Sequence, residues 1–129
     1  MLAKLLVVDD DPNLLDLMRL ILRPTGWEVL TAQSGPEALD MAHCHQPDLI
    51  VLDMMMPGMK GFEVCNRLRA SKRFRDVPIV ALTGAAEDYE HTLALQAGAD
   101  AVITKPISAQ HLTERLKAFL APVRIGVRF

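Results

Sequence analysis

The sequence predicts a single α/β domain in which a five-stranded, parallel, doubly wound sheet carries helices on both faces. Five short aliphatic runs alternate along the 129-residue chain with segments whose apolar residues recur at helical spacing. Strands that alternate with helices of this length form parallel sheets with right-handed crossovers. Four of the five runs also end on a polar or charged residue, and the strand ends of an open parallel sheet form its usual binding edge.

The predicted strands are short runs of Val, Ile, Leu and Ala, bounded by charged or turn-forming residues. They lie at residues 4–8, 28–32, 49–52, 79–82 and 101–104. The first run, KLLVV, is too short for a helix and has no alternating polar face. We therefore expect it to be a strand that is buried on both sides.

Capping and turn residues mark the ends of the predicted helices. The first helix begins after Asp11 with Pro12 at its first position, and Pro24 and Gly26 end it. Gly98 is expected to end the fourth helix in a left-handed conformation, which is easy for glycine. The first three predicted helices lie at residues 12–22, 37–45 and 61–71. Residues 84–96 are expected to turn and then form the fourth helix, and Ser108 is expected to cap the last helix.

Apolar spacing assigns the inner faces of these helices. Leu93 and Leu95 are expected to face the core in the fourth helix, and Leu112 and Leu116 in the last one, which Pro122 should end. Five basic residues at the end of the third helix and after it are expected to form a solvated face and loop. They are Arg67, Arg69, Lys72, Arg73 and Arg75.

Composition excludes several classes of protein. Half of the residues are hydrophobic, and the net charge of −2 gives no general attraction to nucleic acid or to a membrane surface. No apolar run approaches about 20 residues, and the N-terminus becomes acidic too early for a signal peptide, so we expect a cytoplasmic protein. Cys44 and Cys65 have no metal-like spacing and are expected to be free thiols.

The chemistry-bearing residues follow the ends of four strands. Asp9 and Asp10 follow the first, Asp53 the third, Thr83 the fourth and Lys105 the fifth. Because the strands are parallel, these side chains should converge at one edge. Clustered carboxylates repel one another unless a cation joins them, and an all-oxygen site suits Mg²⁺.

An aspartate can accept a phosphoryl group covalently, and the metal, the Lys105 ammonium and the Thr83 hydroxyl can bind the oxygens of that group. The sequence therefore predicts Mg²⁺-dependent phosphoryl transfer to Asp53.

Four motifs resemble the receiver domain of two-component response regulators, the group that includes the chemotaxis regulator. They are VVDDDP at 7–12, DMMMPGMKG at 53–61, ALTG at 81–84 and TKP at 104–106. The resemblance covers residues 4 to about 121. It implies a flavodoxin-like sheet with strand order 2-1-3-4-5, a receiver domain at residues 1–121, and a tail or the start of a linker at residues 122–129.

The resemblance also implies roles for individual residues. Asp53 would be the phosphorylation site, and Asp10, Asp53 and the backbone carbonyl of Met55 would bind Mg²⁺, with support from Asp9 that is partly through water. Thr83 would be drawn to the phosphoryl group, Lys105 would pair with it, and the peptide bond between Lys105 and Pro106 would be cis.

The implied phosphoryl donor is a phosphohistidine on a sensor histidine kinase or a phosphotransfer protein. Such a chain is a signalling module that assists its own phosphorylation and dephosphorylation, rather than a conventional enzyme, and phosphorylation switches its partner binding. A homodimer or an output domain is compatible with the resemblance, whereas direct contact of this domain with nucleic acid or a membrane is not expected.

Three positions bear on how such a switch would work. The family commonly has Tyr or Phe three residues before the motif lysine, and this chain has Val102 there. The usual aromatic relay is therefore in question. Met55 and Ala85 place no carboxylate or amide near an attacking water, which predicts slow loss of the phosphoryl group.

The last eight residues, PVRIGVRF, alternate apolar and polar side chains after a proline, which predicts an extended segment. This segment could begin a linker to an output domain, dock on a partner, or be a frayed end, and we favour the linker.

Two other functions are compatible with parts of the pattern. A small-molecule phosphatase of the haloacid-dehalogenase type would also use an aspartyl-phosphate, but it needs a second Asp two residues after the nucleophile, where this chain has Met55. A phosphorylation-independent scaffold would be favoured if the acid pair or the lysine were missing, and both are present.

Overall fold

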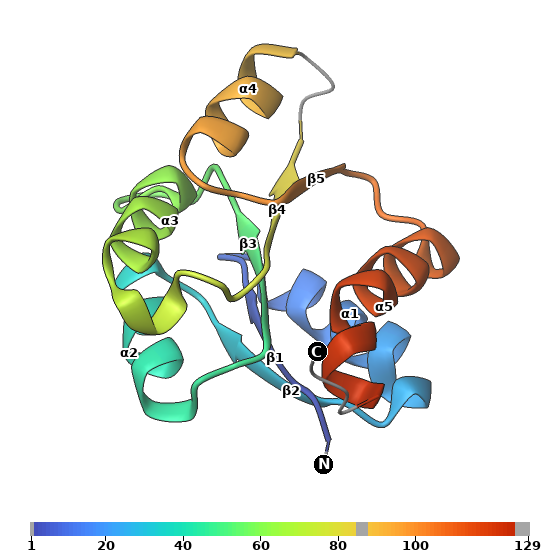
Figure 1. The fold of residues 1–129 in the computed structure, drawn as a ribbon. Coiled ribbons are helices and arrows are strands. Elements are labelled where there is room, and N and C mark those ends of the chain that lie inside the picture. Colours follow the sequence, from blue (N-terminus) through green and yellow to red (C-terminus); the bar gives the residue numbers. More distant parts are fainter. Residues whose placement is uncertain (1, 85–87, 126–129) are drawn as a thin grey trace.

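The computed structural model describes residues 2–84 and 88–125 and contains one parallel sheet with helices on both faces (Figure 1). The strand order is β2-β1-β3-β4-β5, and every neighbouring pair is parallel. The strands are β1 (Lys4–Val8), β2 (Glu28–Ala32), β3 (Leu49–Asp53), β4 (Ile79–Thr83) and β5 (Ala101–Thr104). The predicted fold class, strand order and five strands are confirmed.

Five α-helices connect or follow the strands. They are α1 (Pro12–Leu22), α2 (Gly35–His45), α3 (Gly61–Ala70), α4 (Asp88–Gln96) and α5 (Ala109–Ile125), with short 3₁₀ turns η1 (Arg23–Thr25) and η2 (Lys72–Phe74). Helices α1 and α5 lie on one side of the sheet, and α2, α3 and α4 lie on the other (Figure 1).

The central strands are aliphatic on both faces because both faces are covered. In β1, Leu5 and Val7 belong to the core beneath α1 and α5, whereas Leu6 and Val8 belong to the core beneath α2, α3 and α4. All residues of β3 and β4 are buried. This double burial explains why the predicted strands are continuous apolar runs rather than alternating ones.

The ends of the helices depend on side-chain and glycine caps. Asp11 caps α1 by accepting a hydrogen bond from the backbone N–H of Asn13, as the sequence predicts. Ser34 caps α2 through the N–H of Glu37, so α2 begins at Gly35, two residues earlier than predicted. Gly98 has a φ of 112°, which confirms the expected left-handed conformation.

Two predictions about helix faces and ends are wrong. Leu95 is 52% exposed, whereas Ala94 next to it is fully buried, because α4 turns Ala94 rather than Leu95 toward the sheet. Helix α5 continues to Ile125 through Pro122, so the predicted extended segment does not begin at 122. A proline removes one helical hydrogen bond, but its φ fits helical backbone. Residues 126–129 lie outside the described part of the chain.

The prediction that Arg69 belongs to a solvated face is wrong. Its guanidinium donates to the backbone carbonyls of Phe74 and Val77 at 2.7 Å and of Gly98 at 2.9 Å, and it pairs with Asp100 at 2.8 Å. A Cβ on Gly98 would lie 2.6 Å from the Cγ of Arg69, so this approach requires glycine. Arg69 thus joins the segment after α3 to the loop before β5.

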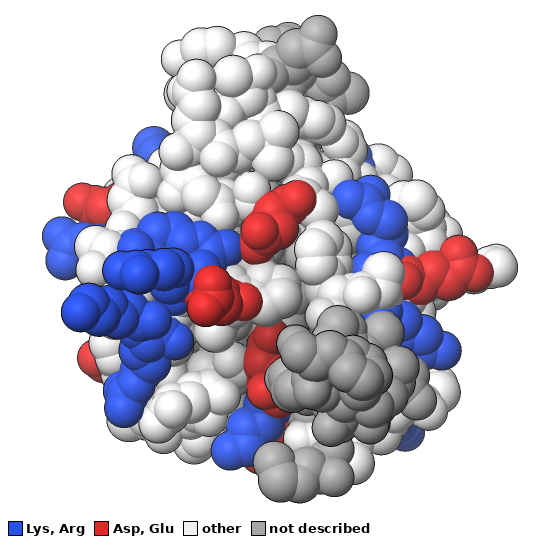
Figure 2. Space-filling view, viewed as in Figure 1, with Lys and Arg blue, Asp and Glu red and all other residues white. Residues whose placement is uncertain are grey.

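The other four basic residues are not buried, as expected. Figure 2 shows basic side chains gathered on the side of the molecule that carries α3 and η2. Arg67 pairs with Glu63 at 3.6 Å on the exposed face of α3, and Arg73 donates to the carbonyl of His43 at 3.4 Å.

The two cysteines are free, as predicted, with Cys44 exposed and Cys65 buried. Burial raises the pKa of the Cys65 thiol to about 11, which keeps it protonated and unreactive at neutral pH. Within residues 2–84 and 88–125, none of the helices combines the length and the apolar character that a membrane span requires.

Replacing Arg69 with alanine should lower the free energy of unfolding by about 2–4 kcal/mol, because several partly buried carbonyls and Asp100 would lose their donor. Urea denaturation measures this change. Arg67→Ala is the matched control, and it should lower the free energy by less than about 0.5 kcal/mol because its ion pair is exposed. Equal effects of the two variants would contradict the assignment.

Candidate functional site

The residues predicted for the site lie at the carboxyl ends of four neighbouring strands. Asp9 and Asp10 follow β1, Asp53 ends β3, Thr83 ends β4, and Lys105 follows β5. The strand registers align these ends, because Val8 pairs with Leu52, Asp53 with Leu82 and Thr83 with Thr104. Parallel pairing therefore brings residues that are up to 96 positions apart to one edge of the sheet.

Three carboxylates form a compact acidic cluster at this edge. One oxygen each from Asp9, Asp10 and Asp53 lies within 4.8 Å of the other two. Asp9 and Asp53 are 1% and 5% exposed, whereas Asp10 is exposed. Such a set supplies only oxygen ligands and leaves one side open to solvent, which suits a hard cation that keeps some of its water.

Lys105 partly neutralises the cluster. Its Nζ lies 3.0 Å from Oδ2 of Asp9 and 3.7 Å from Oδ2 of Asp53. Burial alone would lower the pKa of Lys105, but the hydrogen bond to Asp9 and the charges of Asp53 and Asp9 outweigh burial and raise it. The lysine is therefore charged at neutral pH, and its side chain bridges β5 to the ends of β1 and β3. The peptide bond between Lys105 and Pro106 is cis, as predicted.

Asp53 is held by the chain that follows it. The backbone N–H of Met55 donates to Oδ1 of Asp53 at 3.1 Å. The pKa of Asp53 is raised, and the largest cause is burial. The hydrogen bond from Met55 and the charge of Lys105 lower this pKa, whereas the negative charges of Asp9 and Asp10 raise it further. Burial and like charges thus disfavour the ionised form until a further cation is present.

The loop after Asp53 is packed closely against the strand end. Met54 and Met56 are fully buried, whereas Met55 between them is 46% exposed. A Cβ at position 61 would overlap the carbonyl oxygen of Asp53, so only glycine allows α3 to start there. From the sequence alone, Gly61 is recognisable as a chain break but not as a close contact of the site.

Thr83 is fully buried, and its hydroxyl donates to Oε2 of Glu90 at 2.5 Å. Sequence reasoning did not identify Glu90, and its only signal is its place near the start of the helix that follows β4. Val102, at the position where the family commonly has Tyr or Phe, packs against the core beneath α2, α3 and α4. Ala85 lies outside the described residues.

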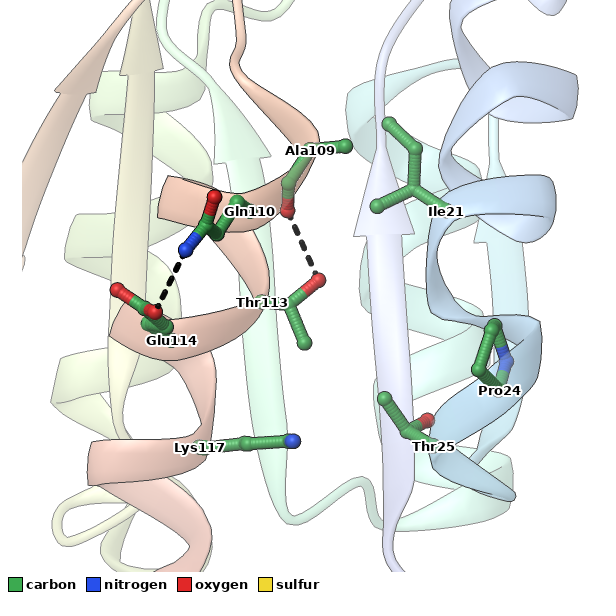
Figure 3. A pocket seen from close by; sticks show the side chains of 8 residues that line it. All are labelled: Ile21, Pro24, Thr25, Ala109, Gln110, Thr113, Glu114 and Lys117. Carbon is green, nitrogen blue, oxygen red and sulfur yellow. Dashed lines mark hydrogen bonds between the residues drawn. The ribbon is translucent and has the colours of Figure 1, made fainter.

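A groove lies between α1 and α5 (Figure 3). This groove has a volume of about 390 Å³ and is lined by Ile21 and Pro24 on one side and by Thr113 and Lys117 on the other. Thr113 donates to the carbonyl of Ala109 at 2.9 Å, within α5 itself. None of the predicted site residues lines the groove, so it is separate from the acidic cluster.

Comparison with known proteins identifies the family. The family model of the response regulator receiver domain matches residues 5–117. This chain belongs to the response regulator receiver domain family. The predicted resemblance is confirmed, and the chain is a receiver domain of two-component signalling.

Two curated relatives show the same relationship. The alkaline phosphatase synthesis transcriptional regulatory protein PhoP of Bacillus subtilis is 44% identical over 117 residues, which are 91% of this chain and 48% of that protein. The DNA-binding response regulator MtrA of Mycolicibacterium smegmatis is 39% identical over 120 residues, which are 93% of this chain and 51% of that protein. The chain spans about half the length of these relatives.

Solved receiver domains share the fold. The chemotaxis protein CheY4 of Vibrio cholerae superposes with a TM-score of 0.88 and 32% identity, covering 93% of this chain and 100% of that one. A CheY-like receiver domain protein of Methanospirillum hungatei gives a TM-score of 0.88 and 30% identity, covering 98% and 100%.

The raised pKa of Asp53 predicts how the stability of the metal-free protein depends on pH. The pKa of the Asp53 carboxyl in the folded protein lies above its ordinary value of 3.8. Its contribution to folding stability is therefore complete at pH values below 3.8 and is lost as the pH rises through the pKa of the folded state. At neutral pH in a chelator, Asp53→Asn should therefore raise the free energy of unfolding, on the order of 1 kcal/mol. The gain should vanish toward acidic pH.

Urea denaturation between acidic and neutral pH measures this difference. Asp40→Asn, which removes an exposed carboxylate from α2, is the control and should change the free energy by less than about 0.5 kcal/mol. A less stable Asp53→Asn variant at neutral pH would contradict the electrostatic interpretation.

Proposed function

We propose that Asp53 accepts a phosphoryl group from a phosphohistidine of a sensor histidine kinase or a phosphotransfer protein, in a Mg²⁺-dependent reaction that switches partner binding. The observation that carries this proposal is the cluster of Asp9, Asp10 and Asp53 beside the Lys105 ammonium. A nearly buried carboxylate with two acidic neighbours and one fixed cation matches the needs of phosphoryl transfer to an aspartate.

The acidic cluster fits the metal that the family implies. Asp10, Asp53 and the backbone carbonyl of Met55 would hold Mg²⁺, and Asp9 would support it partly through water. All of these ligands are oxygens, and the exposed side of Asp10 leaves room for bound water and for phosphoryl oxygens. When bound, the ion supplies positive charge to those oxygens.

The chain's own residues account for the rest of the reaction. An ionised oxygen of Asp53 forms the new bond to phosphorus while the bond from phosphorus to the donor's imidazole nitrogen breaks, and the imidazole leaves with the electron pair of that bond. The Met55 N–H orients the carboxylate at 3.1 Å. Lys105 provides a fixed positive charge for the phosphoryl oxygens, and Thr83 provides a hydroxyl donor.

The geometry favours this switch over the two other functions. A phosphatase acting on small molecules would need an acid at position 55, and the thioether of Met55 cannot transfer a proton. A phosphorylation-independent scaffold would not require a lysine 3.0 Å from one carboxylate and 3.7 Å from another. We therefore assign a signalling module that assists its own phosphorylation and dephosphorylation, rather than a conventional enzyme.

Partners of this domain are proposed by class. The names of PhoP and MtrA describe a transcriptional regulator and a DNA-binding protein, so an output domain is one partner we propose for this domain. The net charge of −2 gives the domain no general attraction to nucleic acid or to a membrane, so we propose no direct contact with either. A homodimer is a second candidate assembly, and a cytoplasmic location suits both.

Incubation with acetyl phosphate and Mg²⁺ should add about 80 Da to the intact mass, the increment of one phosphoryl group. The adduct should be absent from Asp53→Asn, because the nucleophilic carboxylate is replaced by a neutral amide, and present in the control Asp40→Asn. An adduct that survives in Asp53→Asn, or no adduct on the unaltered protein, would refute phosphorylation of Asp53.

Mg²⁺ binding, measured by isothermal titration calorimetry of chelator-treated protein, should weaken at least about tenfold in Asp10→Asn, because a charged ligand is lost. Asp11→Asn is a closely matched control, since Asp11 caps α1 and is not part of the acidic cluster. Its affinity should stay within about twofold of the unaltered protein. Equal losses in both variants would show a diffuse charge effect rather than ligation by Asp10.

A further inference from the structure

Two consecutive side chains near the start of α4 contact the ends of β4 and β5. The hydroxyl of Thr83 donates to Oε2 of Glu90 at 2.5 Å, and Nε2 of His91 lies 3.1 Å from Oγ1 of Thr104. Thr83 and Thr104 are partners in the register of β4 and β5. One turn of α4 is therefore attached to the pair of threonines at the strand ends.

The bond to Glu90 competes with the role proposed for Thr83. A threonine hydroxyl carries a single proton, and a bond from it to a carboxylate is charge-assisted and strong. Phosphoryl oxygens accept hydrogen bonds and cannot donate to Thr83. To donate to the phosphoryl group, the Thr83 hydroxyl must therefore give up its hydrogen bond to the Glu90 carboxylate.

The surroundings of Thr83 favour two discrete positions of its hydroxyl, one bonded to Glu90 and one bonded to the phosphoryl group. Its side chain is fully buried and β-branched, so few rotamers are available to it. Val102 has no aromatic ring, so ring rotation at this position cannot couple the movement of Thr83 to the protein surface. The bond from Thr83 to Glu90 instead couples the strand end directly to α4.

We propose that Glu90 is the positioning residue of this switch: it holds the Thr83 hydroxyl in the unphosphorylated state and releases the first turn of α4 when the phosphoryl group captures that hydroxyl. His91 keeps the same turn against β5 through Thr104. This inference rests on the proposed phosphorylation of Asp53. It assigns to Glu90 the coupling that an aromatic residue at position 102 would otherwise provide.

The test measures the affinity of the protein for beryllofluoride, a tetrahedral mimic of the phosphoryl group, in the presence of Mg²⁺. Glu90→Gln should bind it about five- to tenfold more tightly, because a neutral amide oxygen holds the Thr83 proton less strongly than a carboxylate does. Glu90→Ala, which removes the acceptor, should bind at least as tightly as Glu90→Gln.

Two controls separate positioning from general charge and packing effects. Glu28→Gln removes the same charge from an exposed site at the amino end of β2 and should leave the affinity unchanged. In a Thr83→Val background, which has no hydroxyl, Glu90→Gln should have no further effect on affinity.

Release of α4 has a second readout in amide hydrogen exchange. Exchange across α4 should become faster in the unaltered protein when beryllofluoride binds, because the first turn of the helix loses its attachment to Thr83. Exchange in α2, on the same face of the sheet but without a bond to Thr83, should stay the same.

The possible failures are distinguishable. If the unaltered protein binds no beryllofluoride and forms no adduct on Asp53, the proposed function fails and this inference fails with it. If the unaltered protein binds but Glu90→Gln matches it, the role of Glu90 is wrong while the proposed function stands. An effect of Glu90→Gln that persists without the Thr83 hydroxyl, or exchange in α4 that does not change, would also overturn the inference.

Discussion

Three carboxylates held within 4.8 Å of one another, with one ammonium beside them, are the constraint on which the rest of this structure depends. Left to themselves, like charges this close would separate or protonate. They stay together because they follow or end two neighbouring strands, β1 and β3, whose register is fixed. The backbone N–H groups of Asp11 and Met55 then hold Asp9 and Asp53 at 2.9 Å and 3.1 Å.

The apolar cores supply the stability that this arrangement requires. Both faces of β1, β3 and β4 are covered, so a strand cannot slip by one residue without reversing the direction of every buried side chain. The same double coverage fixes the height at which each strand ends. Placement of the acidic residues is therefore a consequence of packing far from them, and the site needs no long loop to assemble.

How much could be predicted from the sequence depended on whether a feature is local or periodic. The strands and the convergence of Asp9, Asp53 and Lys105 follow from aliphatic runs and from the rule that parallel strands end at one edge. The inner face of α4 was assigned wrongly because alternating Leu and Ala give that short helix no clear apolar stripe. Pro122 was predicted to end α5, but the helix continues past it to Ile125.

Arg69 and Glu90 could not be found from the sequence for a different reason. The main partners of Arg69 are backbone carbonyls, which carry no sequence signature, and they come from segments up to 29 residues away. Glu90 reaches Thr83 only because α4 folds back over the end of β4. Both residues resemble ordinary charged residues of a helix until the tertiary structure supplies their partners.

The Arg69 network has a mechanical consequence for the sheet. Asp100, which binds Arg69, also accepts the backbone N–H of Ile79 at 2.8 Å, so the starting points of β4 and β5 are tied to one anchored group. The opposite ends of these two strands carry Thr83 and Thr104. Because this anchor lies at the other end of β4 and β5 from Thr83, breaking the bond between Thr83 and Glu90 would leave the bases of both strands in place. The freedom gained by the start of α4 would then be confined to that helix, without loosening the remainder of the domain.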